Sequence, residues 1–120
     1  MIEIIEGMPD KVVAVNASGV VKEEDYDKVL VPLIEDKKEK YGKIRFLYQL
    51  DKDFERFTRK AMLEDAKAAT QHFTSFEKIA VVSDEDWVIN AMEIFKYVIP
   101  GPVRTYSNEE LAEAKAWISE

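Results

Sequence analysis

Short apolar runs alternate with stretches of helical periodicity along this chain, and this alternation restricts the fold more than any other feature. Residues 12–17 and 78–83 are rich in β-branched and apolar side chains, which is typical of strands. Between such runs, apolar residues recur every three or four positions, as they do on one face of a helix. Alternating strands and helices predict a mostly parallel sheet with helices packed against it.

Turn and cap signals set the expected boundaries. Gly7 and Pro9 mark a turn, so the first two strands are expected to pair as a hairpin, and Ser18–Gly19 is expected to end the second strand. Pro32 lies inside the first helical stretch and predicts a kink or local irregularity, because proline has no N–H for the carbonyl four residues back. Strands are expected at residues 2–6, 12–17, 44–49, 78–83 and 103–106, and helices at 22–40, 58–73 and 85–98 and after the S-x-x-E capping box at 107–110.

The order of these elements is ββαβαβαβα. It predicts an α/β protein with one domain over residues 1–120, built as a five-stranded mixed sheet with four helices. The run at 78–83 is the most uniformly apolar, so we expect it to be the central strand.

Composition excludes several classes of function. The 120 residues carry 24 Asp and Glu against 17 Lys and Arg, a net charge of −7, so nucleic acid is not an expected partner. The chain has no cysteine, and its N-terminus lacks a secretory pattern, so a cytoplasmic location is expected. The longest uncharged run, residues 12–21, is about half the roughly 20 residues that a membrane span requires.

Motifs of catalysis are missing as well. His72 is the only histidine, which makes a metal site unexpected, and near the end of a helix it is interpreted as a cation that favours the helix dipole. No nucleophile elbow, phosphate-binding loop or dinucleotide fingerprint is present. We therefore expect no catalytic residues, no metal and no cofactor, and a protein that is not an enzyme.

The stretch at 85–98 has more apolar surface than a helix on the surface of a protein normally shows. Two adjacent faces are apolar, whereas an ordinary stripe is only a little over ~100° wide. Three alternatives remain for what covers this apolar surface: the last helix with Trp117 and Ile118, a second copy of the chain, or an apolar ligand or bilayer surface. Trp87 and Tyr97 combine an apolar body with a polar tip, which suits an interface.

The segment after the third strand, residues 51–58, is interpreted as a charged turn. In open α/β proteins, ligand contacts usually lie at such a junction, beyond the carboxyl end of a strand. Phe54 and Phe57 either pack onto the core or line the mouth of a pocket. Thr58 is either the N-cap of the next helix or a phosphate acceptor, since helix N-termini stabilise negative charge.

A local basic run stands out against the acidic whole. It is either a solvated helix end or part of a site for an anionic headgroup. Its members are Lys37, Lys38, Lys40, Lys43 and Arg45.

Four stretches carry a resemblance to a known family. They are "MIEIIEGMPDKVVAVNASGVVKEEDYDKVLVPLIE", "KIRFLYQLDKDFERFT", "HFTSFEKIAVVSDEDW" and "PGPVRTYSNEELAEAKAWI", in order along nearly the whole chain. With them the sequence resembles the SpoIIAA-like family, which is related to STAS domains and similar in fold to CRAL-TRIO lipid-binding domains. The resemblance implies a five-stranded mixed sheet with four helices. It also implies either partner switching by phosphorylation or binding of an apolar molecule with reversible membrane contact.

The STAS phosphorylation motif is not reproduced. STAS switches carry a phosphorylated serine in an Asp-Ser-Ser-Gly-like setting after the third strand. The corresponding segment here, residues 51–58, has neither serine nor glycine, and Thr58 is its only candidate phosphoacceptor.

Our leading hypothesis is therefore a non-catalytic protein that binds an apolar or lipid-like small molecule between the second and third helices and the sheet edge, with transient membrane association. The alternative is a regulatory protein-interaction module of the STAS kind, acting through a protein partner or a homodimer. The expected ligand-binding residues are Phe54, Phe57, Met62, Trp87, Met92, Phe95 and Tyr97.

Overall fold

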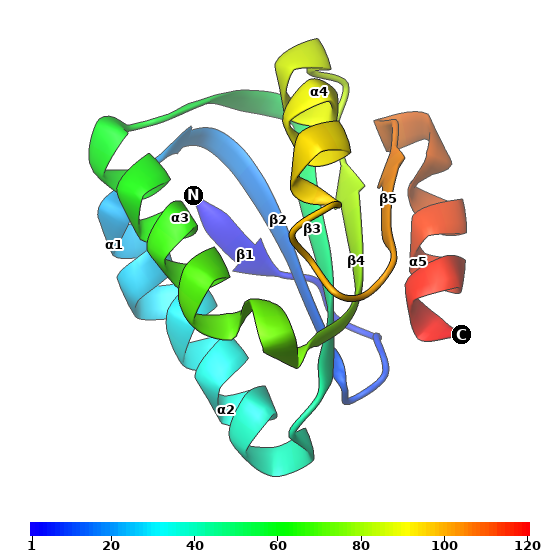
Figure 1. The fold of residues 1–120 in the computed structure, drawn as a ribbon. Coiled ribbons are helices and arrows are strands. Elements are labelled where there is room, and N and C mark those ends of the chain that lie inside the picture. Colours follow the sequence, from blue (N-terminus) through cyan, green and yellow to red (C-terminus); the bar gives the residue numbers. More distant parts are fainter.

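A computed structural model describes residues 1–120 and contains one five-stranded sheet in the order β1-β2-β3-β4-β5 (Figure 1). β1 pairs with β2 antiparallel, and the remaining neighbours pair parallel. The strands are β1 (Ile2–Ile4), β2 (Val12–Val21), β3 (Ile44–Phe57), β4 (Phe76–Val82) and β5 (Val103–Tyr106). The prediction of a five-stranded mixed sheet in one α/β domain is confirmed.

The helices cover the two faces of the sheet unequally. α2, α3 and α4 lie on one face and α5 lies on the other (Figure 1). Spatial order follows chain order from β2 to β5, so right-handed crossovers place every connecting helix on the same face. The helical segments are α1 (Glu23–Asp25), η1 (Tyr26–Leu30), α2 (Val31–Tyr41), α3 (Arg59–His72), η2 (Phe73–Ser75), α4 (Asp86–Phe95), η3 (Asn108–Glu110) and α5 (Leu111–Ser119).

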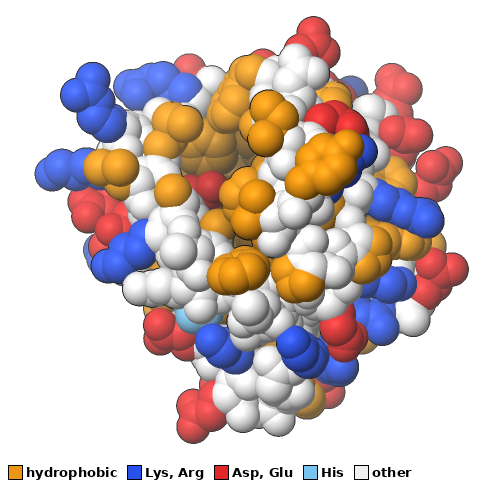
Figure 2. All heavy atoms as spheres, viewed as in Figure 1, with side chains coloured by type: hydrophobic (Ala, Val, Ile, Leu, Met, Phe, Trp, Pro, Cys, Tyr) orange, Lys and Arg blue, Asp and Glu red, His pale blue; other side chains and the backbone are white.

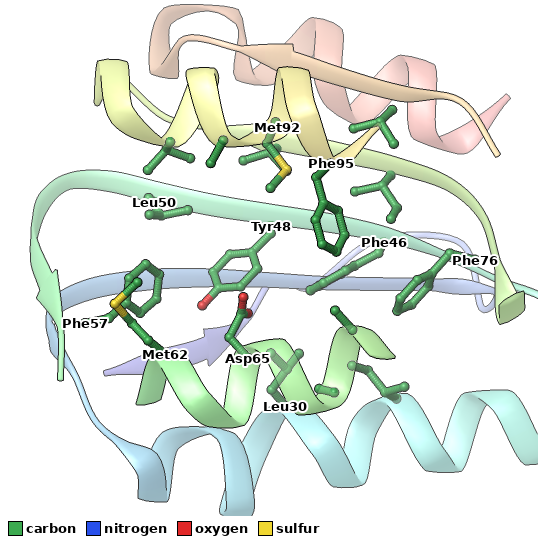
Figure 3. Close-up of a pocket in the computed structure, with 18 of the residues that line it drawn as sticks. Leu30, Phe46, Tyr48, Leu50, Phe57, Met62, Asp65, Phe76, Met92 and Phe95 are labelled. Atoms are coloured by element: carbon green, nitrogen blue, oxygen red, sulfur yellow. The ribbon is translucent and has the colours of Figure 1, made fainter. Parts of the chain in front are cut away.

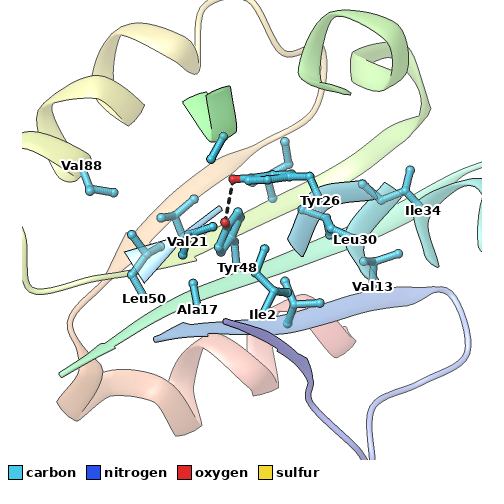
Figure 4. Packing of buried hydrophobic residues seen from close by; sticks show 14 of the residues in the cluster. Ile2, Val13, Ala17, Val21, Tyr26, Leu30, Ile34, Tyr48, Leu50 and Val88 are labelled. Atoms are coloured by element: carbon cyan, nitrogen blue, oxygen red, sulfur yellow. Dashed lines mark hydrogen bonds between the residues drawn. The ribbon is translucent and has the colours of Figure 1, made fainter. Parts of the chain in front are cut away.

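Alternation along the strands divides the core into two parts. In β2, Val13 and Val15 face α2, α3 and α4 and belong to the larger cluster of 18 buried residues. Val12 and Ala14 face α5 and belong to the smaller cluster of 8. Figure 4 shows part of the larger cluster, in which the Tyr26 and Tyr48 hydroxyls meet. The larger cluster is also the one that borders the cavity described below.

The charged turn expected at residues 51–58 is wrong, because β3 continues through it to Phe57. β2 is also longer than expected: it passes through Ser18–Gly19 to Val21 and pairs with this extension. The register shifts around Gly19, which adopts a φ of 60°. The charged side chains of the extension face solvent while Phe54 is buried. The segment predicted as a polar turn is therefore part of a two-stranded ribbon that has one face in contact with solvent.

The irregularity expected at Pro32 is confirmed. The chain forms a π-helical turn over Tyr26–Leu30 immediately before α2, and the Val31 N–H bonds to the Tyr26 carbonyl five residues back. Pro32 follows directly, and because it has no N–H it cannot continue the ladder of backbone hydrogen bonds at this point.

The last helix does not cover α4, because α5 packs on the opposite face of the sheet. The run at 78–83 is not the central strand either. It forms β4, which lies between β3 and β5, so β3 holds the centre of the five. No helix combines the length and apolar content needed to cross a membrane.

Candidate functional site: an apolar cavity between α3, α4 and the sheet

A cavity of about 270 Å³ lies between α3 and α4, above the face of β3 and β4. Eighteen of its 19 lining residues are hydrophobic, and the exception is Asp65. Figure 2 shows hydrophobic side chains gathered around a hollow between the two helices, and Figure 3 shows the residues that line it. The hollow is an apolar site with a single carboxyl group in its wall.

Small residues on the helices and aromatic residues on the sheet create this space. Ala68 and Ala69 of α3 and Ala91 of α4 line the cavity with minimal volume. The floor is Phe46, whose ring centroid lies 5.4 Å from that of Tyr48 and 5.6 Å from that of Phe76. Short side chains above large flat rings leave room that tight helix–sheet packing would otherwise fill.

The structure brings together five of the residues that the sequence nominated. They come from the end of β3, from α3 and from α4, and Figure 3 labels four of them around the cavity. The five are Phe57, Met62, Trp87, Met92 and Phe95.

The other two residues that the sequence predicted to bind ligand, Phe54 and Tyr97, do not line the cavity. Phe54 is buried in the core, and its ring centroid lies 5.0 Å from that of Phe57, which in turn meets Trp87 edge-on at 6.1 Å. It therefore supports the wall from behind. Tyr97 follows the end of α4, is 84% exposed, and carries the Lys96 ammonium 5.7 Å from its ring centre.

Sequence reasoning missed the floor of the cavity and its one acid. Phe46, Tyr48 and Leu50 alternate along β3 and so share a face, a signal that was available in the sequence. Asp65 follows Ala61 by four positions and precedes Ala68 by three, which places it on the sheet-facing stripe of α3. A charge on an apolar stripe is the signal that could have found it.

Asp65 belongs to a chain of three hydrogen-bonding groups. The Tyr26 hydroxyl donates to Asp65 Oδ1 at 3.0 Å, and the Tyr26 and Tyr48 hydroxyl oxygens lie 2.8 Å apart (Figure 4). Burial raises the pKa of both tyrosines, so both are neutral near neutral pH. Burial also raises the pKa of Asp65, and the Tyr26 hydrogen bond opposes that rise. Asp65 is itself an exposed residue, so its carboxyl lies where the cavity opens to water.

The carboxyl end of the parallel strands is closed by internal hydrogen bonds. Asn108 donates from its backbone and side chain to Asp84 at 3.0 Å, which lowers the Asp84 pKa, and it accepts from Gln49 at 2.9 Å. The strand order does not reverse among the parallel strands, so the sheet lacks the switch point where such folds open a crevice. The cavity lies under the helices for this reason and not beyond the strand ends.

Thr58 is the N-cap of α3. Its Oγ1 accepts a hydrogen bond from the Ala61 N–H at 3.1 Å. Lys22, Arg59 and Lys60 lie around the same shallow surface hollow. Glu23 and Glu24 also line this hollow, so the capping hydroxyl lies among three cations and two carboxylates.

Each cation of the basic run forms a hydrogen bond or an ion pair with another group of the chain. Their partners are backbone carbonyls, carboxylates and one imidazole, which ties the end of α2 to neighbouring segments. The pairs are Lys37 with the Asp10 carbonyl, Lys38 with His72, Lys40 with Asp36, Lys43 with the Thr74 carbonyl, and Arg45 with Glu77 and the Ile118 carbonyl.

Comparison with known proteins agrees with this architecture. A family model described as SpoIIAA-like matches residues 12–119. The chain belongs to the SpoIIAA-like family. A solved structure of an uncharacterized protein with a SpoIIAA-like fold from Shewanella loihica PV-4 superposes with a TM-score of 0.73 at 23% sequence identity, covering 98% of this chain and 92% of that one. No curated protein matches the sequence. SpoIIAA-like and STAS domains are generally non-enzymatic, and the comparisons establish the fold of this member.

Proposed function

We propose that this SpoIIAA-like protein is a non-catalytic binding protein for a small apolar molecule, held in the cavity between α3, α4 and the sheet. The observation that supports the proposal is a lining of 18 hydrophobic residues out of 19 around about 270 Å³. Ligand pockets are mostly apolar with a few placed polar groups, and they begin near ~300 Å³. An apolar cavity of about 150 Å³ holds benzene, so this one has room for roughly twice as many carbon atoms.

The rim of the cavity supports transient contact with an apolar surface during exchange of the molecule. Two large apolar side chains that line the cavity also face solvent, because Met62 of α3 and Trp87 of α4 are 52% and 47% exposed. Exposed apolar surface next to a cavity is typical of interaction sites. With a net charge of −7, the surface favours a neutral membrane over an anionic one.

Native mass spectrometry of gently purified protein tests the proposal. We expect a monomer whose native mass exceeds its denatured mass by the mass of one small apolar molecule, bound non-covalently. Phe95→Asp places a charge in the cavity wall and should abolish the adduct, because burying an unpaired carboxylate is strongly unfavourable. Ile94→Asp makes the same chemical change at the neighbouring exposed position and should retain the adduct.

Circular dichroism of both variants checks that they remain folded. A bare dimer in the native spectrum would contradict the proposal and assign the exposed face of α4 to self-association. An adduct retained in folded Phe95→Asp would contradict the assignment of the site.

A second function, binding of a protein partner under phosphate control, is favoured by the setting of Thr58. The residue stands at a helix N-terminus, where a phosphate would be stabilised. Three cations, Lys22, Arg59 and Lys60, outnumber the two carboxylates, Glu23 and Glu24, around it. Thr58→Asp retains a capping side chain and mimics the charge, so it should change the affinity for a partner by at least tenfold without unfolding α3. Thr70→Asp, on the exposed part of the same helix, is the control. Equal affinities for the two variants in a binding assay would exclude this function.

A further inference from the structure

The polar corner of the cavity carries information about the ligand that the apolar walls do not. Asp65 is the one lining residue that is not hydrophobic, and Tyr48 contributes a hydroxyl beside it. Figure 3 shows Asp65 reaching from α3 toward Tyr48 across the cavity wall. The inference drawn from this corner rests on the proposed function, since it names the chemical class of the molecule bound there.

Because Asp65 is exposed to solvent and accepts a hydrogen bond from Tyr26, we take it to be ionised at pH 7.5. The protons of the three-residue chain then have a fixed direction. A carboxylate only accepts, so the single Tyr26 proton is used at Asp65 Oδ1, 3.0 Å away. Tyr48, 2.8 Å from Tyr26, must then donate to the Tyr26 oxygen. Both hydroxyl protons are consumed inside the protein. Asp65 Oδ2 and a lone pair on the Tyr48 oxygen remain as acceptors.

The charges around the polar corner also favour a ligand that donates a hydrogen bond. The groups that face Asp65 are the neutral hydroxyls of Tyr26 from η1 and Tyr48 from β3. Asp25 from α1 adds a negative charge that acts on Tyr48. The cavity-lining residues of α4 are all apolar, and no Lys or Arg lines the cavity. No cation is present to neutralise an acidic ligand.

We propose that the ligand is an apolar molecule with about ten heavy atoms that carries one hydrogen-bond-donating group, a hydroxyl or a protonated amine, bound by Asp65. The apolar body lies against the Phe46 and Phe76 rings, with Met92 and Phe95 above it. A carboxylate headgroup is disfavoured because it would meet the Asp65 charge and two hydroxyls that have no proton to give.

Four probes of nearly equal size separate the headgroup from the apolar body. They are octylamine, 1-octanol, n-nonane and octanoate, titrated at pH 7.5 with calorimetry and with fluorescence of Trp87, which lines the cavity. Trp117, on the other face of the sheet, supplies a constant background. Octylamine and 1-octanol should each bind at least about tenfold more tightly than octanoate, the size expected for a hydrogen bond to a charged group.

Two variants test the role of Asp65 itself. Asp65→Asn keeps the size and an acceptor for Tyr26 but removes the charge, so octylamine should lose about tenfold in affinity and octanoate should gain. The nonane affinity should not change. Glu64→Gln makes the same change in net charge one residue away, outside the cavity lining, and should leave all four affinities as they are.

The outcomes distinguish the headgroup assignment from the proposed function. If octanoate binds as tightly as 1-octanol, the headgroup assignment is overturned while binding of apolar molecules stands. If Asp65→Asn and Glu64→Gln behave alike, Asp65 is not the binding group. If none of the four probes binds, the cavity does not take small apolar molecules and the proposed function fails with the inference.

Discussion

His72, the last residue of α3, has its charge decided by its immediate neighbours. The side chain is only 6% exposed, and its Nδ1 lies 3.3 Å from the Lys38 ammonium. Burial and then the Lys38 charge lower the imidazole pKa, with Glu35 opposing them. The sequence-based interpretation of His72 as a helix-stabilising cation is therefore wrong, because the dipole effect is smaller than the cost of burying a charge beside another cation.

This lowered pKa predicts an acid-sensitive fold. Below the ordinary histidine pKa of 6.5, the unfolded chain binds a proton that folded His72 resists, so the free energy of unfolding falls as the pH drops through and below that value. His72→Gln should make the dependence shallower between pH 7.5 and pH 5. Urea unfolding of both proteins at several pH values measures it. The difference between the two curves cancels contributions from Asp65. Parallel curves would contradict the assignment.

At the scale of single residues, the sequence could predict which side chains gather but not what they do to each other. The aromatic and methionine residues of α4 and β3 were found because apolar periodicity reports which face is buried. Asp65 could have been found as a charge on the apolar stripe of α3, but its hydrogen bond could not, because its partner Tyr26 lies 39 residues away along the chain. Hydrogen-bond partners that distant leave no local pattern.

Among the elements, α4 is held at its C-terminal end by an unusually close contact. Gly101, between two prolines, packs against β4 so tightly that a Cβ there would overlap the backbone carbonyl of Glu77. The overlap is with backbone in the interior of a sheet, which has little freedom to move. Ile99, just after α4, is buried in the larger core cluster and fixes the same segment. We therefore expect this contact to help position α4, which covers the cavity.

Gly101→Ala should therefore reduce both stability and binding. We expect a loss of about 1–3 kcal/mol in the free energy of unfolding, the range for overpacking, and weaker binding of 1-octanol because the end of α4 shifts. Gly42→Ala is the control. An added Cβ there meets nothing within 4 Å, but the φ of 74° is strained for alanine, so it costs stability at the far end of α2. Denaturant unfolding and 1-octanol titration measure both quantities. Unchanged 1-octanol affinity in Gly101→Ala would show that the contact does not position α4.

The periodicity of apolar residues predicted the order and type of the helices and strands. It did not predict that β3 extends to Phe57. β4 pairs with β3 only as far as Gln49, so the later part of β3 has β2 as its single neighbour and one face in water. A strand that faces solvent on one side and pairs with a single neighbouring strand needs few apolar side chains. The sequence of this part of β3 is therefore as rich in charged residues as a turn. The same extension carries Phe57 to the cavity.

For the molecule as a whole, the cavity results from the order of the parallel strands, because their connections all place a helix on the same face of the sheet. Three helices share one face of the sheet and a single helix serves the other, so the crowded face must divide its surface between them. α3 approaches through alanines and α4 stands apart across the cavity. The sequence predicted the helices and their order, but the spacing between α3 and α4 depends on the summed volumes of side chains from seven elements. Volume sums of that kind cannot be read from any one segment.

The sheet also has an order of assembly. Each parallel strand joins the edge left by the strand before it in the chain, so a partner always exists by the time a new strand leaves the ribosome. Folding during synthesis proceeds from the N-terminus, and here it needs no strand to wait for a later one. The open edge moves from β2 to β3 to β4, and it stops at β5, whose four residues offer little for another chain to pair with. A protein wound this way therefore gives each new parallel strand a partner as soon as it is made.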